Sequence, residues 1–217
     1  MRQKYAVQLK GMKEDFLLLH SVSIKNLELV KAILDEQDNF DTIRKSKELD
    51  WNVRQLSEQI EQNCFKILSL QQPLAKDLRF IVAVLKNTTD FERISRDSLH
   101  SIEELSAILP RLKKEHIQLI IQMVDSICHM MEVLNLALET ESVANPKKLS
   151  EIDSIVDEAY DKVMDSITKD FEVNANRLPE MISLASLVRY LERVGDHICN
   201  IAERWYYTLK AERIVIK

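Results

Sequence analysis

Glycine and proline are scarce in this sequence, and their scarcity limits the fold. The 217 residues include two glycines and four prolines, and 6% of the residues are aromatic. Tight turns and hairpins depend on glycine, proline and asparagine, so little material is present for a β-rich chain. Leucine, isoleucine, lysine and glutamate dominate instead, and this balance favours helices. We therefore expect an all-α protein.

Three further shortages exclude whole classes of function. Cys64, Cys128 and Cys199 have no Cys-x-x-Cys spacing, so we expect buried free thiols rather than zinc or redox chemistry. The formal net charge is -5 and no run of lysine and arginine occurs, which argues against nucleic acid as the main ligand. No run approaches the roughly 18 apolar residues of a membrane span, and the first 20 residues lack the apolar region of a signal peptide. We expect a cytoplasmic protein with no direct membrane span.

The prolines divide the chain into long helical segments. Each falls between stretches with apolar residues at three- and four-residue intervals, and proline is tolerated at helix starts but not in helix interiors. They are Pro73, Pro110, Pro146 and Pro179. With a further break near residues 38 and 39, the pattern predicts six helices, the first three at about 3–36, 42–70 and 74–109. Helices of this length need antiparallel neighbours to bury their apolar faces.

The second half of the chain repeats the first. Residues 48–53 (ELDWNV) match residues 151–156 (EIDSIV), and residues 91–95 (FERIS) match residues 191–195 (LERVG). The order and spacing agree within a few residues, which indicates internal duplication. We expect two tandem three-helix bundles, at residues 1–109 and 110–217. No glycine-, serine- or proline-rich linker separates them, so we expect them to pack closely.

The second half places two acidic pairs at helical spacing. Glu192 and Asp196 are four residues apart, and a like-charged pair in that geometry is destabilising unless a cation intervenes. Gly195 lies between them, although glycine costs roughly 1 kcal/mol relative to alanine within a helix. This face is therefore expected to need the close approach of a metal or a neighbouring helix. Asp153 and Asp157 repeat the four-residue spacing on the preceding helix, with Glu158 beside them.

We interpret Asp153, Asp157, Glu192 and Asp196 as candidate metal ligands. If the two helices run antiparallel, their acidic faces can converge, and several carboxylate oxygens suit iron(II), manganese or magnesium. His197 lies about 100° around the helix from Asp196 and is expected to be peripheral. The alternative interpretation is a solvated acidic face, which is the usual role of such pairs on long helices.

The first half departs from this acidic pattern. Arg54 stands where Asp157 stands in the second half, and Arg96 stands at the position of Asp196. These arginines can neutralise the neighbouring acids, Asp50 and Glu92, directly. A shift of the alignment by one residue would recruit Asp97 instead, but it would break the match of the apolar positions. We therefore expect no metal in the first half.

Several motifs together resemble the PhoU family of bacterial regulators of phosphate uptake and phosphate signalling. They are residues 71–79 (QQPLAKDLR), residues 90–94 (DFERI) and the stretch 191–203. The resemblance spans both halves. It implies two three-helix bundles with a repeated acidic motif that can hold multinuclear iron, with manganese, magnesium and zinc as alternatives.

The same resemblance implies a role and partners. The family acts as a cytoplasmic adaptor, often a homodimer, between the ATPase of a phosphate ABC transporter and a phosphate-sensing histidine kinase. These partners would bring the protein to the inner face of the membrane. In that role the family represses phosphate-starvation genes when phosphate is plentiful.

Three other classes remain open. A metal-free helical scaffold or adaptor is the strongest of them. A di-iron carboxylate enzyme needs Glu-x-x-His pairs, which do not occur in the sequence. A histidine-phosphotransfer module needs a marked histidine, and His20, His100, His116 and His129 share no such setting. The sequence shows no nucleophile, phosphate loop or acid–base constellation, so we expect a non-enzymatic function.

Overall fold

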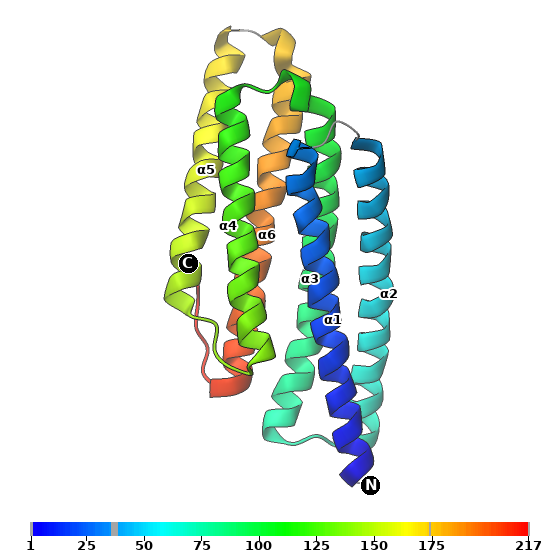
Figure 1. Cartoon of the computed structure of the whole chain (residues 1–217). Helices are drawn as coiled ribbons and strands as arrows, with labels where there is room; N and C mark the ends of the chain where they lie inside the picture. The colour runs from blue at the N-terminus through cyan, green and yellow to red at the C-terminus, as the bar shows by residue number, and fades with distance from the viewer. Residues whose placement is uncertain (1, 36–38, 174, 217) are drawn as a thin grey trace.

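The computed structural model describes residues 2–35, 39–173 and 175–216, and these residues form six long α-helices (Figure 1). In order they are α1 (Arg2–Asp35), α2 (Asn39–Gln71), α3 (Ala75–Ile108), α4 (Lys114–Glu139), α5 (Pro146–Val173) and α6 (Leu178–Lys210). Two short 3-10 helices, η1 (Leu109–Arg111) and η2 (Ala175–Arg177), precede α4 and α6. The predicted all-α fold is confirmed.

The prolines stand where their chemistry allows. Pro146 is the first residue of α5 and Pro179 the second residue of α6, and a missing backbone N–H removes no helical hydrogen bond at those positions. Pro110 lies within η1, at the repeat boundary predicted at residues 109 and 110, and the boundary itself stays a prediction. Residue 36, residue 38 and the two chain ends, which also belong to predicted segments, lie outside the described residues.

The six helices form two sets of three that lie side by side (Figure 1). Helices α1, α2 and α3 pack against one another, and so do α4, α5 and α6. The two sets meet mainly along α3 and α6, which share the most extensive contact of any two elements, with a smaller contact between α1 and α4. Two tandem bundles, called repeat 1 and repeat 2 below, are therefore present as expected.

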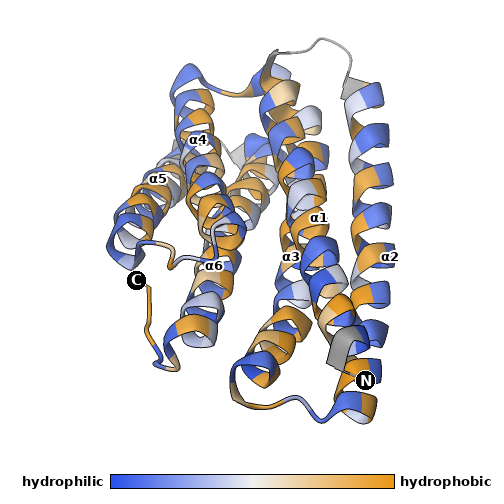
Figure 2. Ribbon diagram, turned by 60° about the horizontal axis from the view of Figure 1, so that its bottom comes forward, coloured by the Kyte–Doolittle hydropathy of each residue, from blue (hydrophilic) through white to orange (hydrophobic). Residues whose placement is uncertain are grey.

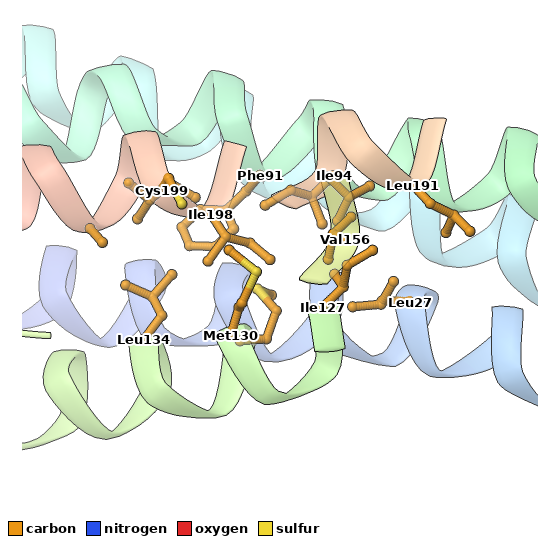
Figure 3. Close-up of a cluster of buried hydrophobic side chains, with 14 of the residues drawn as sticks. Leu27, Phe91, Ile94, Ile127, Met130, Leu134, Val156, Leu191, Ile198 and Cys199 are labelled. Atoms are coloured by element: carbon orange, nitrogen blue, oxygen red, sulfur yellow. The ribbon is translucent and has the colours of Figure 1, made fainter. Parts of the chain in front are cut away.

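One hydrophobic core runs through both repeats. Apolar residues gather on the inward faces of the helices and hydrophilic residues on the outward faces (Figure 2). In the close-up of Figure 3, Phe91 of repeat 1 and Ile198 of repeat 2 lie in the same cluster as Met130. All three side chains are fully buried. Because burial of apolar surface is the main stabilising term, the shared cluster holds the repeats together.

Helix α4 is more apolar than the sequence analysis allowed. By length and composition alone it is the one helix, among those described, that could cross a membrane. Many of its apolar residues, however, pack against neighbouring helices, and Met123, Ile127 and Leu134 are fully buried, whereas Leu136 is exposed. A core helix of this kind needs the same composition as a membrane span. Burial in the bundle therefore accounts for the apolar face of α4 that includes these three buried residues.

Candidate functional site

The four predicted ligands come together on one side of repeat 2. Helix α5 carries Asp153 and Asp157, and the antiparallel α6 beside it carries Glu192 and Asp196 (Figure 1). Asp153 is buried, Glu192 is half-buried, and Asp157 and Asp196 are exposed. The set therefore runs from the core to the surface, and we call it the acidic face.

The pKa values show that these carboxylates act on one another. Burial raises the pKa of Asp153 to about 6, and the charges of Asp157, Asp196 and Glu192 add to the effect. Burial also raises the pKa of Glu192, again with help from Asp196 and Asp157. The pKa of Asp157 is raised by burial and by the charge of Asp196. The pKa of each of these three groups therefore responds to a carboxylate on the other helix, and Asp196 is among the charges that act on all three.

The acidic face has no internal compensation. No hydrogen bond or ion pair joins any of its four carboxylates to another described residue. Arg189 and Arg193 lower the pKa of Glu192 only as secondary charges. A bound cation would therefore relieve the mutual repulsion, and a hard divalent ion would accept these oxygen ligands.

Gly195 explains how Asp153 reaches α6. A Cβ atom on Gly195 would lie 3.0 Å from Asp153 Oδ1, closer than side-chain atoms normally approach. The next neighbour, Met130 Sδ, would be 3.9 Å away. The predicted close approach at Gly195 is therefore present, and the approaching group is a carboxylate of the acidic face. This geometry accounts for a glycine in a helix interior, where it costs about 1 kcal/mol relative to alanine.

The carboxylates are neighbours without forming a finished ligand shell. Among the described residues, no three His, Cys, Asp or Glu side chains are gathered closely enough to hold a metal ion as they stand. Four uncompensated carboxylates are expected to keep this separation, because like charges repel. Cys199 lies one turn beyond Gly195, but burial and then the charge of Asp153 raise its pKa and keep the thiol protonated. The oxygen atoms are therefore the donors of this site.

Glu158 and His197 lie outside the acidic face. Glu158 is exposed, and its Oε2 lies 3.5 Å from Lys162 Nζ on the same helix. His197 is buried, and its Nδ1 lies 2.9 Å from Asp90 Oδ1 of α3. The sequence prediction that His197 is peripheral to the candidate ligands agrees with this position, but its partner was not foreseen.

Asp90 forms the centre of a polar network between the repeats that the sequence analysis missed. Arg204 of α6 donates hydrogen bonds to Asp90 and, at 3.1 Å, to Asn87 Oδ1. Burial alone would raise the pKa of Asp90, but the hydrogen bonds from His197 and Arg204 lower it. The available signal was a polar residue on the apolar face of a helix, one turn before Ile94. The network joins α3 to α6 and lies apart from the acidic face.

Asp97 also belongs to the contact between the repeats. It is buried, and its Oδ2 lies 3.5 Å from Arg193 Nε of α6. Its carboxylate is therefore engaged with α6, which favours the alignment that is not shifted by one residue.

The matching face of repeat 1 carries arginines, and one of them pairs with a buried acid. Asp50 is buried, and Arg54 donates a hydrogen bond to its Oδ2. Glu92 is half-buried, and its pKa is raised, mainly by burial and also by the charge of Glu61. Ser57 lowers this pKa, and Arg96 and Arg54 lower it as weaker, more distant charges. The predicted pairing is confirmed as an ion pair for Arg54 and Asp50. For Arg96 and Glu92 it is a longer-range attraction, with no ion pair between them.

The comparisons with known proteins agree with this architecture. The model of the PhoU domain matches residues 16–104 and 120–205, one segment in each repeat. A protein of Deinococcus radiodurans, described as a phosphate-specific transport system accessory protein PhoU homolog, is 30% identical over 175 residues, which are 80% of this chain and 81% of that protein. A protein of Synechocystis with the same description is 29% identical over 214 residues, 98% of this chain and 94% of that protein.

Solved structures show the same fold over the whole chain. The crystal structure of PhoU from Pseudomonas aeruginosa superposes with a TM-score of 0.87 at 21% identity, covering 96% of this chain and 100% of that one. The regulatory protein PhoU of Streptococcus pneumoniae gives a TM-score of 0.79 at 22% identity, covering 97% and 99%. Because the PhoU domain model matches both repeats and similar proteins align over most of their length, this chain belongs to the PhoU family.

Proposed function

We propose that this protein regulates phosphate uptake as a cytoplasmic adaptor between the ATPase of a phosphate ABC transporter and a phosphate-sensing histidine kinase. The observation that carries the proposal is the match of the PhoU domain to both repeats, together with relatives described as accessory proteins of phosphate-specific transport systems. The adaptor works by binding rather than by catalysis, as a homodimer at the inner face of the membrane. It represses phosphate-starvation genes when phosphate is plentiful.

Deletion of the gene tests this role. We expect a strain without the protein to express a phosphate-starvation reporter in phosphate-rich medium, because the signal of sufficiency is lost. Reintroduction of the wild-type gene should restore repression. An unchanged reporter in a strain that lacks every member of the family would contradict the proposal.

We further propose that the acidic face of repeat 2 binds a divalent metal, with iron preferred over manganese, magnesium and zinc. The support is electrostatic: its carboxylates perturb one another across two helices and have no partner among the described residues. In repeat 1, Arg54 already forms an ion pair with Asp50. Metal would draw the four carboxylates together and remove their repulsion.

The duplication supplies a matched pair of variants for this metal site. Glu192→Gln and Glu92→Gln remove one carboxylate at equivalent positions, and both side chains are half-buried. We expect Glu192→Gln to lower the bound iron or manganese, measured by mass spectrometry on dialysed protein. Glu92→Gln should leave the metal content unchanged. Equal losses in the two variants would mean that the repeats are equivalent and that the assignment to repeat 2 is wrong.

A metal-free adaptor is the second candidate, because the carboxylates do not form a ligand shell as they stand. Protein purified without added metal separates the two. Under the metal-binding proposal, iron(II), manganese or magnesium raises the unfolding temperature of the wild type but not of Asp196→Asn. In chelator, Asp196→Asn should be as stable as the wild type or more stable, since one repulsive charge is gone. If no divalent ion changes the wild-type temperature, the metal-free adaptor is the correct description.

A further inference from the structure

A cleft lies between the first half of α3 and the last turns of α6, and Arg213 and Ile214 of the C-terminal segment (residues 211–216) line one side of it. Its volume is about 510 Å³, within the range of small-molecule sites. Leu78 and Val82 of α3 and Ile214 of the C-terminal segment give it apolar walls. Residues of both repeats line it, so it exists only in the assembled molecule.

The charged lining of the cleft is mostly cationic. Arg79, Lys86, Arg204 and Arg213 contribute four positive charges, against one negative charge from Glu203. Glu203 already accepts a hydrogen bond from the backbone N–H of Ile216 at 2.7 Å. The lining therefore has three more positive than negative groups, although the whole chain has a net charge of -5. Such a local excess attracts anions.

Three of these cationic side chains form no ion pair that would compete with a bound anion. Arg204 is bound to the buried Asp90, but Arg79, Lys86 and Arg213 form no ion pair with any described residue. The one hydrogen bond of Arg79 to the described part of the chain is long, 3.4 Å from Nε to the Thr208 carbonyl. Its two terminal nitrogens are therefore free to donate to a ligand, as is the ammonium group of Lys86.

The C-terminal segment is anchored so that Arg213 stays at the cleft. Ala211 adopts a left-handed conformation with φ of 59°, which turns the chain at the end of α6. Ile216 is buried, and its N–H bonds to Glu203. Between these two anchors, the guanidinium of Arg213 lies 5.9 Å from the centroid of the Tyr207 ring. This segment follows residue 205, where the second match to the PhoU domain ends.

We propose that this cleft binds a small molecule that carries phosphate groups on an aromatic or apolar body, which is the chemistry of a nucleotide. The planar guanidinium groups of Arg79 and Arg213 match phosphate oxygens in pairs, and Lys86 adds a point charge. Tyr207 and the apolar walls provide a surface for the body of the ligand. The inference goes beyond the adaptor role and does not depend on metal at the acidic face.

Calorimetric titration of the full-length protein with ADP tests the proposal. The buffer contains a chelator, because a metal at the acidic face could otherwise recruit the nucleotide. We expect ADP to bind and its affinity to fall as salt is added. Adenosine, inorganic phosphate and pyrophosphate should each bind at least about tenfold more weakly, since each lacks one part of the ligand.

Variants locate the binding in the cleft. Arg79→Gln and Arg213→Gln should each weaken ADP binding about tenfold, because each removes a charge-assisted hydrogen bond. Arg213→Lys keeps the charge and should recover part of the affinity. Lys66→Gln is the matched control, since Lys66 is an exposed lysine on α2 outside the cleft. Unfolding temperatures of all variants check that the fold is retained.

Three results would overturn the inference. The first is an absence of ADP binding to the wild type. The second is binding of inorganic phosphate or pyrophosphate as tight as that of ADP, since the cations would then recognise phosphate alone. The third is an equal loss of affinity in Lys66→Gln, which would show non-specific attraction to the protein surface.

Discussion

At the residue scale, Asp153 has the most strongly shifted pKa of the acidic face. Burial and three neighbouring carboxylates raise its pKa from 3.8 to about 6. The folded state therefore holds the proton of Asp153 more tightly than the unfolded state does. Its contribution to stability is fully present below about pH 4 and is lost as the pH rises through about 6.

The first prediction concerns this pH dependence. In chelator, the wild type should lose about 2 to 3 kcal/mol of unfolding free energy relative to Asp153→Asn between about pH 4 and pH 7. Urea unfolding at a series of pH values measures the difference. Asp165→Asn, which changes an exposed acid on the same helix, is the control and should follow the wild type. If Asp153→Asn also follows the wild type, Asp153 titrates normally and the electrostatic account is wrong.

The second prediction uses the two glycines of the chain. Gly195→Ala puts a methyl group 3.0 Å from Asp153 Oδ1, whereas the same change at Gly11 meets nothing within 4 Å. Both changes favour the helix by up to about 1 kcal/mol. We expect Gly195→Ala to weaken metal binding about tenfold, because Asp153 must move, and to leave stability in chelator unchanged or higher.

Gly11→Ala should stabilise the protein and leave metal binding unchanged. Titration of iron(II) or manganese, monitored by calorimetry, gives the two affinities. Unaltered metal affinity in Gly195→Ala would show that the position of the Asp153 carboxylate does not matter for binding.

The sequence analysis identified side chains that lie close together along the chain, and it missed contacts between residues that are far apart in the chain. The carboxylate pairs could be found because a spacing of four places two side chains on one helix face. The partners of Asp90 could not, because His197 and Arg204 are 107 and 114 positions away. The burial of Asp153 also depends on how α5 packs on α6, which no local pattern records.

At the element scale, α3 and α6 join the repeats through both apolar and charged contacts. Asp90 is buried and receives hydrogen bonds from His197 and Arg204. A buried acid that accepts hydrogen bonds from a histidine and an arginine loses much of its stabilising effect when it is neutralised, because Arg204 then loses its counter-charge. An exposed pair between the repeats, Lys31 of α1 and Asp125 of α4, offers a comparison.

The third prediction compares these two contacts. Asp90→Asn should destabilise the protein by about 3 kcal/mol, since it removes one partner of a buried charge network. Asp125→Asn should cost less than about 1 kcal/mol, because its ion pair with Lys31 is solvent-exposed. Urea unfolding at neutral pH measures both. Similar effects of the two changes would mean that burial does not strengthen the Asp90 network.

The helices themselves were predictable from local chemistry. Proline positions and apolar periodicity gave helix ends within three residues of those observed for α2 and α3. The choice of α3 and α6 as the joining pair was not predictable, because all six helices have an apolar face. It depends on which faces remain uncovered after each bundle forms.

At the scale of the whole molecule, the shared core predicts cooperative unfolding. Side chains of both repeats form one hydrophobic cluster, so neither repeat keeps its core when the other unfolds. Trp205 of repeat 2 is buried, and its indole N–H bonds to the Ser142 carbonyl at 2.9 Å. Trp51 of repeat 1 is exposed. The two tryptophans therefore differ in what they report.

The fourth prediction follows from this difference. In the variant Trp51→Phe, the fluorescence of Trp205 reports on α6 and on the contact of its indole ring with Phe80 of α3, while circular dichroism reports on all helices. We expect the two signals to change at the same urea concentration, as in a two-state transition. Separate midpoints would show that the repeats unfold independently.

The exchange of Asp157 and Asp196 for Arg54 and Arg96 also gives the molecule a direction. Two identical repeats would offer a binding partner two equivalent docking orientations, and nothing would select between them. Here one repeat presents unpaired carboxylates and the other presents arginines at matching positions. A partner that recognises charge meets two distinguishable surfaces, one on each repeat. Repulsion between like charges excludes one docking orientation, and attraction between opposite charges favours the other. The duplicated chain therefore favours one docking orientation for a charged partner.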